Sequence, residues 1–480
     1  MKKKMTIPAQ SVPVQQFDVA VVGGGTGGVI AAIAAARMGV RTVLIESKGY
    51  LGGTVVEGGT ALHSFFNNWK TFGKEKVQLV RGIPSELVDR VTARGGCTGH
   101  SEMESRYEYD AVCTAIDTEI YKLVAHEMAA EAGVTVYTNT VMTGAVVNDG
   151  RIEALTISNH VGVSAVRADC FIDATGYGDL CAAAGAGFTE PNDKHISAPI
   201  GVAGVDMDKY AAYFASLGAR TDYARGIRDG EPDGIIRVDG RRDLLPEEFR
   251  QASRDIGMVL TVTSTHRDYF MFVKMDYRLP VSPTDRDAMS AAELELRQRQ
   301  EKAIELLRKY VPGCEHAYIA RTTPSACIRR GRCILCDYDI TNEDITTGRH
   351  FEDDVFEYGF HDEAPRFNVA EGGSYGFPYR AMLPQGIENL FATGMMITTD
   401  HHAHMSTRNT VSCMAQGQAA GTAAALCSMN RETTRELCYR VLRRKLVENG
   451  VYLADESEEA PKEPPKPAAF VPNKRGEFVQ

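Results

Sequence analysis

A glycine-rich turn between an apolar strand and an alanine-rich helix constrains this chain more than any other feature. Residues 17–22 (FDVAVV) are apolar and β-branched, and the turn of residues 23–28 (GGGTGG) follows them directly. Residues 29–38 have a helical, alanine-rich pattern, and residues 40–45 (VRTVLI) predict a second strand that ends at Glu46. This is a βαβ unit, so the sequence predicts an α/β fold with a buried parallel sheet.

The spacing Gly23-x-Gly25-x-x-Gly28 in this context is typical of dinucleotide binding. Gly23 permits a tight turn, Gly25 lets the backbone approach a pyrophosphate, and Gly28 lets helix and strand pack closely. The start of the helix offers free N–H groups to the phosphates. Glu46 can accept hydrogen bonds from both ribose hydroxyls of the AMP half, and it would repel a 2′-phosphate. The sequence therefore predicts FAD or NAD as the ligand, and not NADP.

Three later segments favour FAD over NAD. Gly52-Gly53-Thr54 adds a second glycine pair, and residues 171–176 (FIDATG) predict a strand that returns to the nucleotide. Gly394 ends a similar strand, and residues 416–421 (QGQAAG) are expected to open a helix whose N–H groups face the flavin pyrimidine. Simple helix packing is the alternative for that last segment. The predicted cofactor-binding residues are Gly23, Gly25, Thr26, Gly27, Gly28, Glu46, Ser47, Gly52, Gly53, Thr54, Val141, Ala174, Thr175, Gly176, Asp179, Gly394, Gln416 and Gly417.

The C-terminal third carries a longer signature. Residues 379–390 (YRAMLPQGIENL) are followed by Gly394, His401, Arg408 and residues 413–425 (CMAQGQAAGTAAA). Together with the GGT loop, these residues resemble the FAD-dependent oxidoreductase family with the glutathione-reductase-type nucleotide fold. The resemblance covers roughly residues 17–60, 114–185, 324–345 and 376–427. It implies a bound FAD and an oxidoreductase activity.

The chain departs from the family pattern at residues 392–395 (ATGM), where the family has Ala-Gly-Arg. The family's arginine is lost, so its contact is not carried over to Met395. Residues 60–110 and 190–320 show little resemblance, and substrate choice is expected to lie there.

Composition shifts near Pro191, which predicts two domains. We expect a discontinuous, glutathione-reductase-type FAD-binding Rossmann domain and a second, α+β substrate or cap domain. A capping box of Ser290 and Glu293 is expected to start the helix that ends near Pro312. A lysine-bearing leader and a Pro-, Lys- and Glu-rich tail are expected to be disordered. The predicted ranges are 1–16 for the leader, 17–190 and 370–450 for the FAD-binding domain, 191–369 for the substrate domain, and 457–480 for the tail.

Composition excludes several partners. The formal charge of −10 offers no basic patch for nucleic acid. The apolar stretch of residues 29–36 is too short to span a membrane. Eleven scattered cysteines indicate reduced thiols and a cytoplasmic protein. A homo-oligomer is left open.

No metal site is predicted. Cys333-x-x-Cys336 lies near Cys327 but lacks a fourth ligand and a helix N-terminus, so buried free thiols are expected. His401, His402 and His404 share one loop, but no further ligand lies at a suitable interval. A polar wall for the substrate is the interpretation we favour for this loop.

The leading hypothesis for function is an FAD enzyme that moves a hydride from a CH–OH or CH–NH group of a polar small molecule to flavin N5. His401, which matches the family's histidine, is expected to be the base that takes the heteroatom proton, with loop ordering as its alternative role. His404 is the second choice and His63 the third. Arg408 is expected to hold a carboxylate or hydroxyl of the substrate.

Two other functions stay open at this point. One is a reductase of an activated C=C bond, although no second glycine fingerprint for NAD(P)H is found. The other is a non-catalytic flavin-binding redox sensor. The electron acceptor, oxygen or another carrier, is not specified by the sequence.

Overall fold

The computed structural model describes residues 9, 11–58, 61–103, 111–219, 221–238, 241–260, 262–397 and 399–454. The predicted tail and most of the predicted leader lie outside these residues. Strand β1 (Val14–Gln16) pairs in parallel with β9 (Gly162–Arg167), so the prediction of a disordered leader is wrong at its last residues. The Ala165 N–H donates to the Pro13 carbonyl at 2.8 Å, which attaches this segment to the β9 edge.

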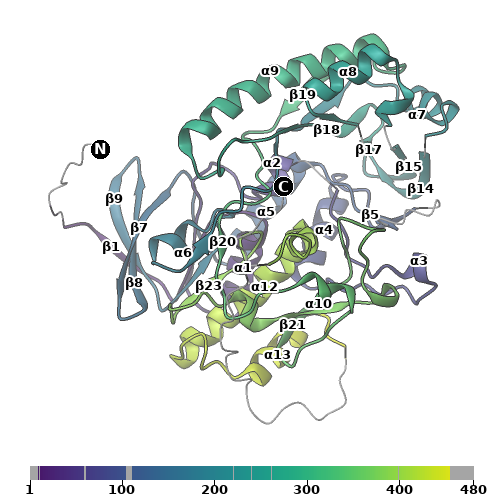
Figure 1. The fold of residues 1–480 in the computed structure, drawn as a ribbon. Helices are drawn as coiled ribbons and strands as arrows, with labels where there is room; N and C mark the ends of the chain where they lie inside the picture. The colour runs from purple at the N-terminus through teal and green to yellow at the C-terminus, as the bar shows by residue number, and fades with distance from the viewer. Residues whose placement is uncertain are drawn as a thin grey trace.

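A five-stranded parallel sheet lies at the centre of the fold, in the order β23-β10-β2-β3-β6 (Figure 1). Its strands are β2 (Val19–Val22), β3 (Thr42–Ile45), β6 (Thr135–Tyr137), β10 (Cys170–Asp173) and β23 (Leu390–Ala392). All but β6 are buried along their whole length, as a parallel strand covered on both faces should be. The apolar runs in the sequence predicted each of these strands.

Helices α1 (Thr26–Arg37) and α12 (Thr410–Asn430) lie side by side in the middle of the molecule (Figure 1). A Cβ added at Gly417 would lie 2.2 Å from the Gly27 carbonyl oxygen. One added at Gly421 would lie 2.1 Å from the Ala31 carbonyl oxygen. The two backbones are therefore in direct contact, which explains why both helices are built from glycine, alanine and other small residues.

We predict that Gly421→Ala destabilises the protein, because the new methyl group forces α12 away from the Ala31 carbonyl. The expected loss is about 1–3 kcal/mol in the free energy of unfolding, measured by urea titration. Gly234→Ala is the matched control, since no heavy atom lies within 4 Å of a Cβ added there. Equal unfolding midpoints for the two variants would contradict the close contact of the helices.

A three-stranded meander leaves the central sheet after β6. It consists of β7 (Val141–Asn148), β8 (Arg151–Asn159) and β9, paired in antiparallel fashion. The β7–β8 turn has positive φ at Asp149 (45°) and Gly150 (75°), which is the conformation favoured in tight hairpins. Val141 is the first residue of β7, which follows β6, the edge strand of the central sheet.

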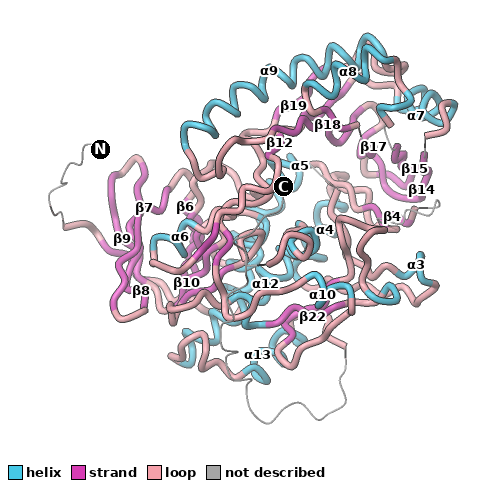
Figure 2. Tube along the Cα trace, in the orientation of Figure 1, coloured by secondary structure: helices cyan, strands magenta, loops and turns pink. Residues whose placement is uncertain are grey.

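A second unit is built on an antiparallel sheet, at the upper right in Figure 2, that is covered by the long helix α9 (Arg286–Tyr310). Its main strands are β13 (Ile200–Ala203), β14 (Thr221–Arg228), β15 (Glu231–Val238), β17 (Val262–His266), β18 (Tyr269–Tyr277) and β19 (Tyr318–Thr322).

The predicted capping box of Ser290 and Glu293 is wrong, because α9 begins earlier. Its N-cap is Asp285, whose side chain accepts from the Ala288 N–H. Ser290 instead donates to the Arg286 carbonyl inside the first turns.

The hydrophobic core of the second unit runs from Ile196 to Ile328. Buried residues from Ile334 onward pack in the core of the central sheet, and β21 (Asp354–Tyr358) pairs there with β22 (Tyr375–Pro378). The hydrophobic core of the second unit thus ends at Ile328, well before residue 369, where the substrate domain was predicted to end. The resemblance to the family across 324–345 marks the return of the chain to the first unit.

The remaining elements are short or peripheral. They are α2 (Thr54–Gly58), α3 (Trp69–Phe72), α4 (Ile83–Ala93), β4 (Ser101–Glu102), β5 (Val112–Cys113), α5 (Thr118–Glu131), α6 (Asp179–Ala183), β11 (Phe188–Thr189), β12 (Ile196–Ser197), α7 (Met207–Ser216), α8 (Glu247–Asp255), β16 (Met258–Val259), β20 (Cys333–Ile334), α10 (Asn342–Thr346), α11 (His404–Thr407) and α13 (Tyr439–Glu448), with 3-10 turns at Arg242–Leu244, Ala370–Gly372 and Tyr379–Met382. Across the described ranges, no helix combines the length and the apolar character needed to cross a bilayer.

A histidine joins the two units. His266 at the end of β17 contacts Asp229 through Nδ1 at 2.7 Å and Asp117, the N-cap of α5, through Nε2 at 3.0 Å. Both ring nitrogens face carboxylates, which only accept hydrogen bonds, so the ring carries both protons. The hydrogen bond to Asp117 is the main cause that raises the pKa of His266 above its ordinary value of 6.5.

We predict that this contact makes stability depend on pH. Because the folded pKa of His266 is raised, its contribution is full below about pH 6.5 and is lost as the pH rises through the folded pKa. The melting temperature of His266→Gln should therefore lie below that of the unmodified protein in mild acid and approach it at alkaline pH. A difference between the two melting temperatures that stays constant over that range would refute the prediction.

Candidate active site

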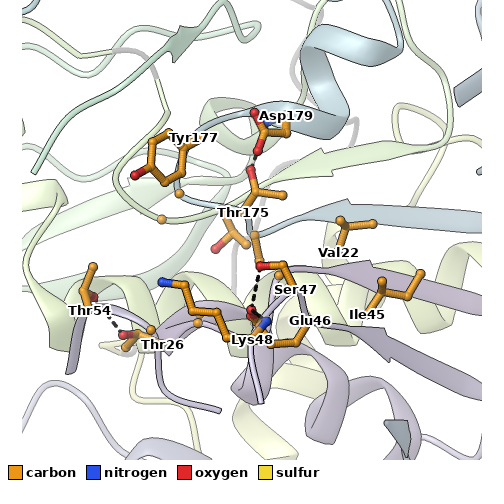
Figure 3. A pocket seen from close by; sticks show the side chains of 18 of the residues that line it. Val22, Thr26, Ile45, Glu46, Ser47, Lys48, Thr54, Thr175, Tyr177 and Asp179 are labelled. Carbon is orange, nitrogen blue, oxygen red and sulfur yellow. Dashed lines mark hydrogen bonds between the residues drawn. The ribbon is translucent and has the colours of Figure 1, made fainter. Parts of the chain in front are cut away.

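A cleft of about 1120 Å³, open to solvent, lies at the carboxyl ends of the parallel strands (Figure 3). In open α/β sheets this edge is where ligands bind. The lining residues come from both units and from both ends of the chain. They are Val22, Gly23, Gly25, Thr26, Gly27, Ile45, Glu46, Ser47, Lys48, Tyr50, Gly53, Thr54, Glu57, Thr140, Val141, Met142, Ala174, Thr175, Gly176, Tyr177, Asp179, Ile328, Thr393, Gly394, Met395 and Cys413.

The glycine turn has the geometry that its spacing predicted. Gly23 has φ 98°, and a Cβ there would lie 2.5 Å from the Ala174 carbonyl oxygen. A Cβ at Gly28 would lie 1.8 Å from the Gly23 carbonyl oxygen, so only glycine allows the helix to start here. Gly25 has no neighbour closer than 3.8 Å to such a Cβ and lies open to the cleft. Gly28 itself is buried and does not line the cleft.

Glu46 ends β3 inside the cleft and is 7% exposed. Its Oε2 accepts from the Gly24 N–H at 2.6 Å, and its Oε1 accepts from the Lys48 N–H at 2.7 Å. The Ser47 hydroxyl donates to the same Oε1 at 3.0 Å (Figure 3). The carboxylate therefore holds the glycine turn against β3 as well as facing the cleft.

The second glycine pair supports the turn from the other side. The Thr26 hydroxyl lies 3.1 Å from the Thr54 hydroxyl and 3.3 Å from the Gly52 carbonyl (Figure 3). A Cβ at Gly53 would lie 2.7 Å from the Gly25 Cα, which shows how closely the two loops pack. Gly52, with φ 121°, makes the turn but does not itself line the cleft.

The strand of residues 171–176 returns to the cleft as predicted. Thr175 donates to the Asp173 carboxylate from its N–H at 3.0 Å and from its hydroxyl at 2.8 Å. The Asp179 N–H donates to the Thr175 hydroxyl at 3.0 Å. Burial raises the pKa of Asp173 above its ordinary value. Ala174 and Gly176 line the cleft beside them.

The prediction for residues 416–421 is wrong in its geometry. Helix α12 begins at Thr410, so Gln416 lies inside the helix and its N–H does not belong to a helix start. The Gln416 side chain accepts from the Gly394 N–H at 2.7 Å and donates to the Thr407 carbonyl at 2.8 Å. Neither Gln416 nor Gly417 lines the cleft. Their role in the structure is to hold Gly394 and α1 in place.

Among the lining residues that the sequence analysis missed, Lys48, Tyr50 and Glu57 form one polar group. The Glu57 carboxylate accepts from the Lys48 ammonium, from the Tyr50 hydroxyl at 2.9 Å and from the Ser325 hydroxyl at 3.1 Å. Figure 3 shows the Lys48 side chain reaching into the cleft. Burial lowers the pKa of Lys48, and burial raises that of Tyr50 to about 12. Their position just after the predicted Glu46 is the signal that could have found them.

The predicted base His401 and its alternatives His404 and His63 do not line the cleft. His404 is fully buried, and its Nε2 donates to the Met395 carbonyl at 3.0 Å. Burial lowers the pKa of His404 well below its ordinary value, so the ring stays neutral. His63 stacks on Phe360, with ring centroids 5.4 Å apart.

His401 and Arg408 are each paired with a carboxylate. His401 Nδ1 lies 2.6 Å from Asp193 Oδ2, and the His401 side chain is 41% exposed. The Arg408 guanidinium pairs with Asp362. Cys413, which lines the cleft, donates from Sγ to the Arg408 carbonyl at 3.3 Å. Arg408 thus contacts the cleft wall through its backbone carbonyl, whereas His401 lies at the border with the second unit.

The chain matches the family described as FAD dependent oxidoreductase over residues 18–446, and it belongs to that family. It is therefore an enzyme, an FAD-dependent oxidoreductase with a Rossmann-like parallel sheet in a mixed α/β fold. The resemblance found in the sequence is confirmed at this level.

Individual relatives match over shorter stretches. Dihydrolipoyl dehydrogenase of Trypanosoma brucei brucei is 54% identical over 43 residues, which are 9% of each chain. Digeranylgeranylglycerophospholipid reductase of Thermoplasma volcanium is 26% identical over 163 residues, 34% of this chain and 40% of that one. A solved structure of a geranylgeranyl bacteriochlorophyll reductase-like protein from Thermoplasma acidophilum has a TM-score of 0.46 at 15% identity, over 91% of this chain and 83% of that one. The curated relatives are thus matched over less than half their length.

The lining residues fit FAD. The first turn of α1 contains no acidic residue and opens at Gly25 into the cleft, which suits a pyrophosphate. Glu46 offers carboxylate oxygens for a ribose, and Thr26 and Thr54 offer hydroxyls nearby. Gly394 and Met395 line the same cleft from the far end of the chain, where a flavin ring would lie.

We predict that Glu46→Ala weakens FAD binding by at least about tenfold, because it removes both a ribose partner and the acceptor of the Gly24 N–H. The measurement is the dissociation constant for FAD added back to flavin-free protein. Glu46→Gln, which keeps one acceptor oxygen, should lose less. The exposed Glu153→Ala is the control, and equal FAD affinity in Glu46→Ala and the control would refute the role.

Proposed function

We propose that this enzyme oxidises a CH–OH or CH–NH group of a polar small molecule by transferring a hydride to flavin N5. The observation that carries the proposal is the His401–Asp193 pair, in which a carboxylate holds an imidazole of the segment that follows Gly394. The glutathione-reductase-type nucleotide fold is the finer class that we propose, supported by the strand order and the glycine turn. A location in the cytoplasm is supported by the free thiols of the cysteines.

The residues of this chain would supply the proton chemistry. FAD, when bound, supplies the hydride acceptor. Asp193 accepts a hydrogen bond from Nδ1 of His401, and Nε2 of the same ring, which lies 3.3 Å from the Lys194 ammonium, is the nitrogen that would take the substrate proton. The partly exposed ring can pass a proton on to solvent. His404 is excluded from this role in the proposal, because burial lowers its pKa and so disfavours the uptake of a proton, and because its Nε2 donates to the Met395 carbonyl.

The alternative is the opposite direction, in which the enzyme reduces an activated C=C bond. The relative from Thermoplasma volcanium is named as a reductase, which supports this alternative. The two directions differ in which compound reduces the flavin. Rapid anaerobic bleaching by NAD(P)H would favour the reductase, and bleaching by an alcohol or amine would favour our proposal.

We predict that His401→Asn retains FAD but slows flavin reduction by about 10²–10⁴-fold, the usual contribution of a general base. The measurement is single-turnover flavin reduction under anaerobic conditions, with the alcohol or amine that reduces the unmodified protein fastest in a metabolite panel. His160→Asn, in the exposed β8–β9 turn, is the matched control. A decrease of less than about tenfold would remove His401 as the base.

A further inference from the structure

Thr393 lies where strand β23 ends at the cleft. It follows Ala392, the last residue of the strand, and its backbone N–H donates to the Asp173 carbonyl at 3.0 Å. Thr393 lines the cleft together with Gly394 and Cys413. The end of the parallel sheet therefore fixes the position of this residue at the cleft.

The Thr393 hydroxyl is buried and has no hydrogen-bond partner within the described part of the chain. The residue as a whole is 1% exposed. The hydroxyls of four other threonines that line the cleft each have a partner in this chain; they are Thr26, Thr54, Thr140 and Thr175. An unpaired buried hydroxyl costs free energy, so such groups are nearly always hydrogen-bonded in a functioning protein. Thr393 is thus the exception that needs an explanation.

The Thr393 hydroxyl faces the first turn of helix α1. A Cβ added at Gly27 would lie 3.4 Å from Thr393 Oγ1 and 2.9 Å from the Cys413 carbonyl oxygen. Gly27 and Cys413 both line the cleft. The first turn of α1 is also the part of the cleft whose N–H groups suit the FAD pyrophosphate. The unpaired hydroxyl therefore lies beside the place where the start of the helix would bind FAD.

The two residues that follow Thr393 offer no donor in its place. The Gly394 N–H already donates to the Gln416 side chain at 2.7 Å. Met395 stands where the family has an arginine, and its thioether donates no hydrogen bond. Within residues 393–395, the Thr393 hydroxyl is therefore the side-chain donor that remains for a ligand.

We propose that the Thr393 hydroxyl donates a hydrogen bond to bound FAD, at an acceptor oxygen of the diphosphate or of the ribityl chain. A hydroxyl carries one donor and rotates to suit its acceptor. FAD would then both form a hydrogen bond and relieve the cost of the unpaired hydroxyl. The inference holds for either direction of hydride transfer, since it concerns the cofactor alone.

This role differs measurably from that of a structural threonine. A hydroxyl bonded within the protein stabilises the fold whether or not FAD is bound. An unpaired hydroxyl destabilises the protein without FAD and stabilises its FAD complex. Removal of the Thr393 hydroxyl should therefore weaken FAD binding without lowering the stability of the flavin-free protein.

The test is urea unfolding of the FAD-loaded protein and of Thr393→Val, which keeps the shape of the side chain, at a series of free FAD concentrations. FAD binds the folded protein, so the rise of stability with FAD concentration gives the dissociation constant, and extrapolation to zero FAD gives the stability without it. We expect the dissociation constant of Thr393→Val to be about 3- to 100-fold higher, the range from a neutral to a charged acceptor. The stability at zero FAD should be equal or higher.

Thr434→Val is the matched control. The Thr434 hydroxyl is also buried and unpaired within the described ranges, but Thr434 does not line the cleft. Its FAD affinity should be unchanged. Thr393→Ser and Thr393→Ala form a second pair, in which the serine keeps the hydroxyl and the alanine lacks it. The alanine variant should bind FAD more weakly than the serine variant, by a factor similar to that of Thr393→Val.

Displacement of FAD from the loaded protein by ADP distinguishes the two acceptors. ADP carries a diphosphate but no ribityl chain. If the acceptor is the diphosphate, Thr393→Val weakens ADP and FAD alike, and the ratio of their dissociation constants stays the same. If the acceptor is the ribityl chain, only FAD is weakened, and less ADP releases it.

Three outcomes overturn the inference. The first is a change of less than about twofold in the FAD dissociation constant of Thr393→Val, too small for a lost hydrogen bond. The second is a loss of stability that is as large at zero FAD as at saturating FAD. The third is an equal loss of FAD affinity in Thr434→Val. If Thr393→Val fails to fold, the serine and alanine variants decide, because equal FAD affinity in these two also overturns the inference.

Discussion

The contact between α1 and α12 is the constraint on which the rest of this structure depends. Glycines at 417 and 421 let the α12 backbone touch that of α1, with no room for a Cβ at either position. This contact joins the first βαβ unit to a segment almost at the other end of the chain. It also sets Gly394 and Cys413 opposite the glycine turn, so the cleft exists only when the two helices meet.

A polar residue of the cleft can have two roles, because it can face the ligand and also hold the backbone in place. Glu46 faces the ligand space and at the same time holds the Gly24 N–H, so the glycine turn is ordered before any nucleotide arrives. Gln416, which does not line the cleft, accepts from the Gly394 N–H and so holds that lining residue in place. At the border with the second unit the charged side chains are paired with one another, Arg408 with Asp362 and both Arg330 and His401 with Asp193.

Prediction from sequence succeeded where the signal is local. The parallel strands, the glycine turn and the β7–β9 meander each follow from apolar runs and turn residues that lie close together in the chain. Prediction from sequence failed where a short sequence pattern is compatible with more than one local structure. Residues 416–421 resemble a helix start, but the Asn409-Thr410 step places that start earlier. Residues 14–16 (VQQ) are exposed and mostly polar, and only their pairing with β9 makes them a strand.

By itself, the sequence determined the family, the FAD-type turn and the parallel sheet, because these depend on the spacing of glycines and apolar residues within short segments. Only the tertiary structure decided which side chains share the site. His401 was predicted in isolation, but Asp193 and Lys194, which set its hydrogen bonds, lie some two hundred residues earlier. No periodicity links such segments, since their meeting depends on how the second unit packs against α11.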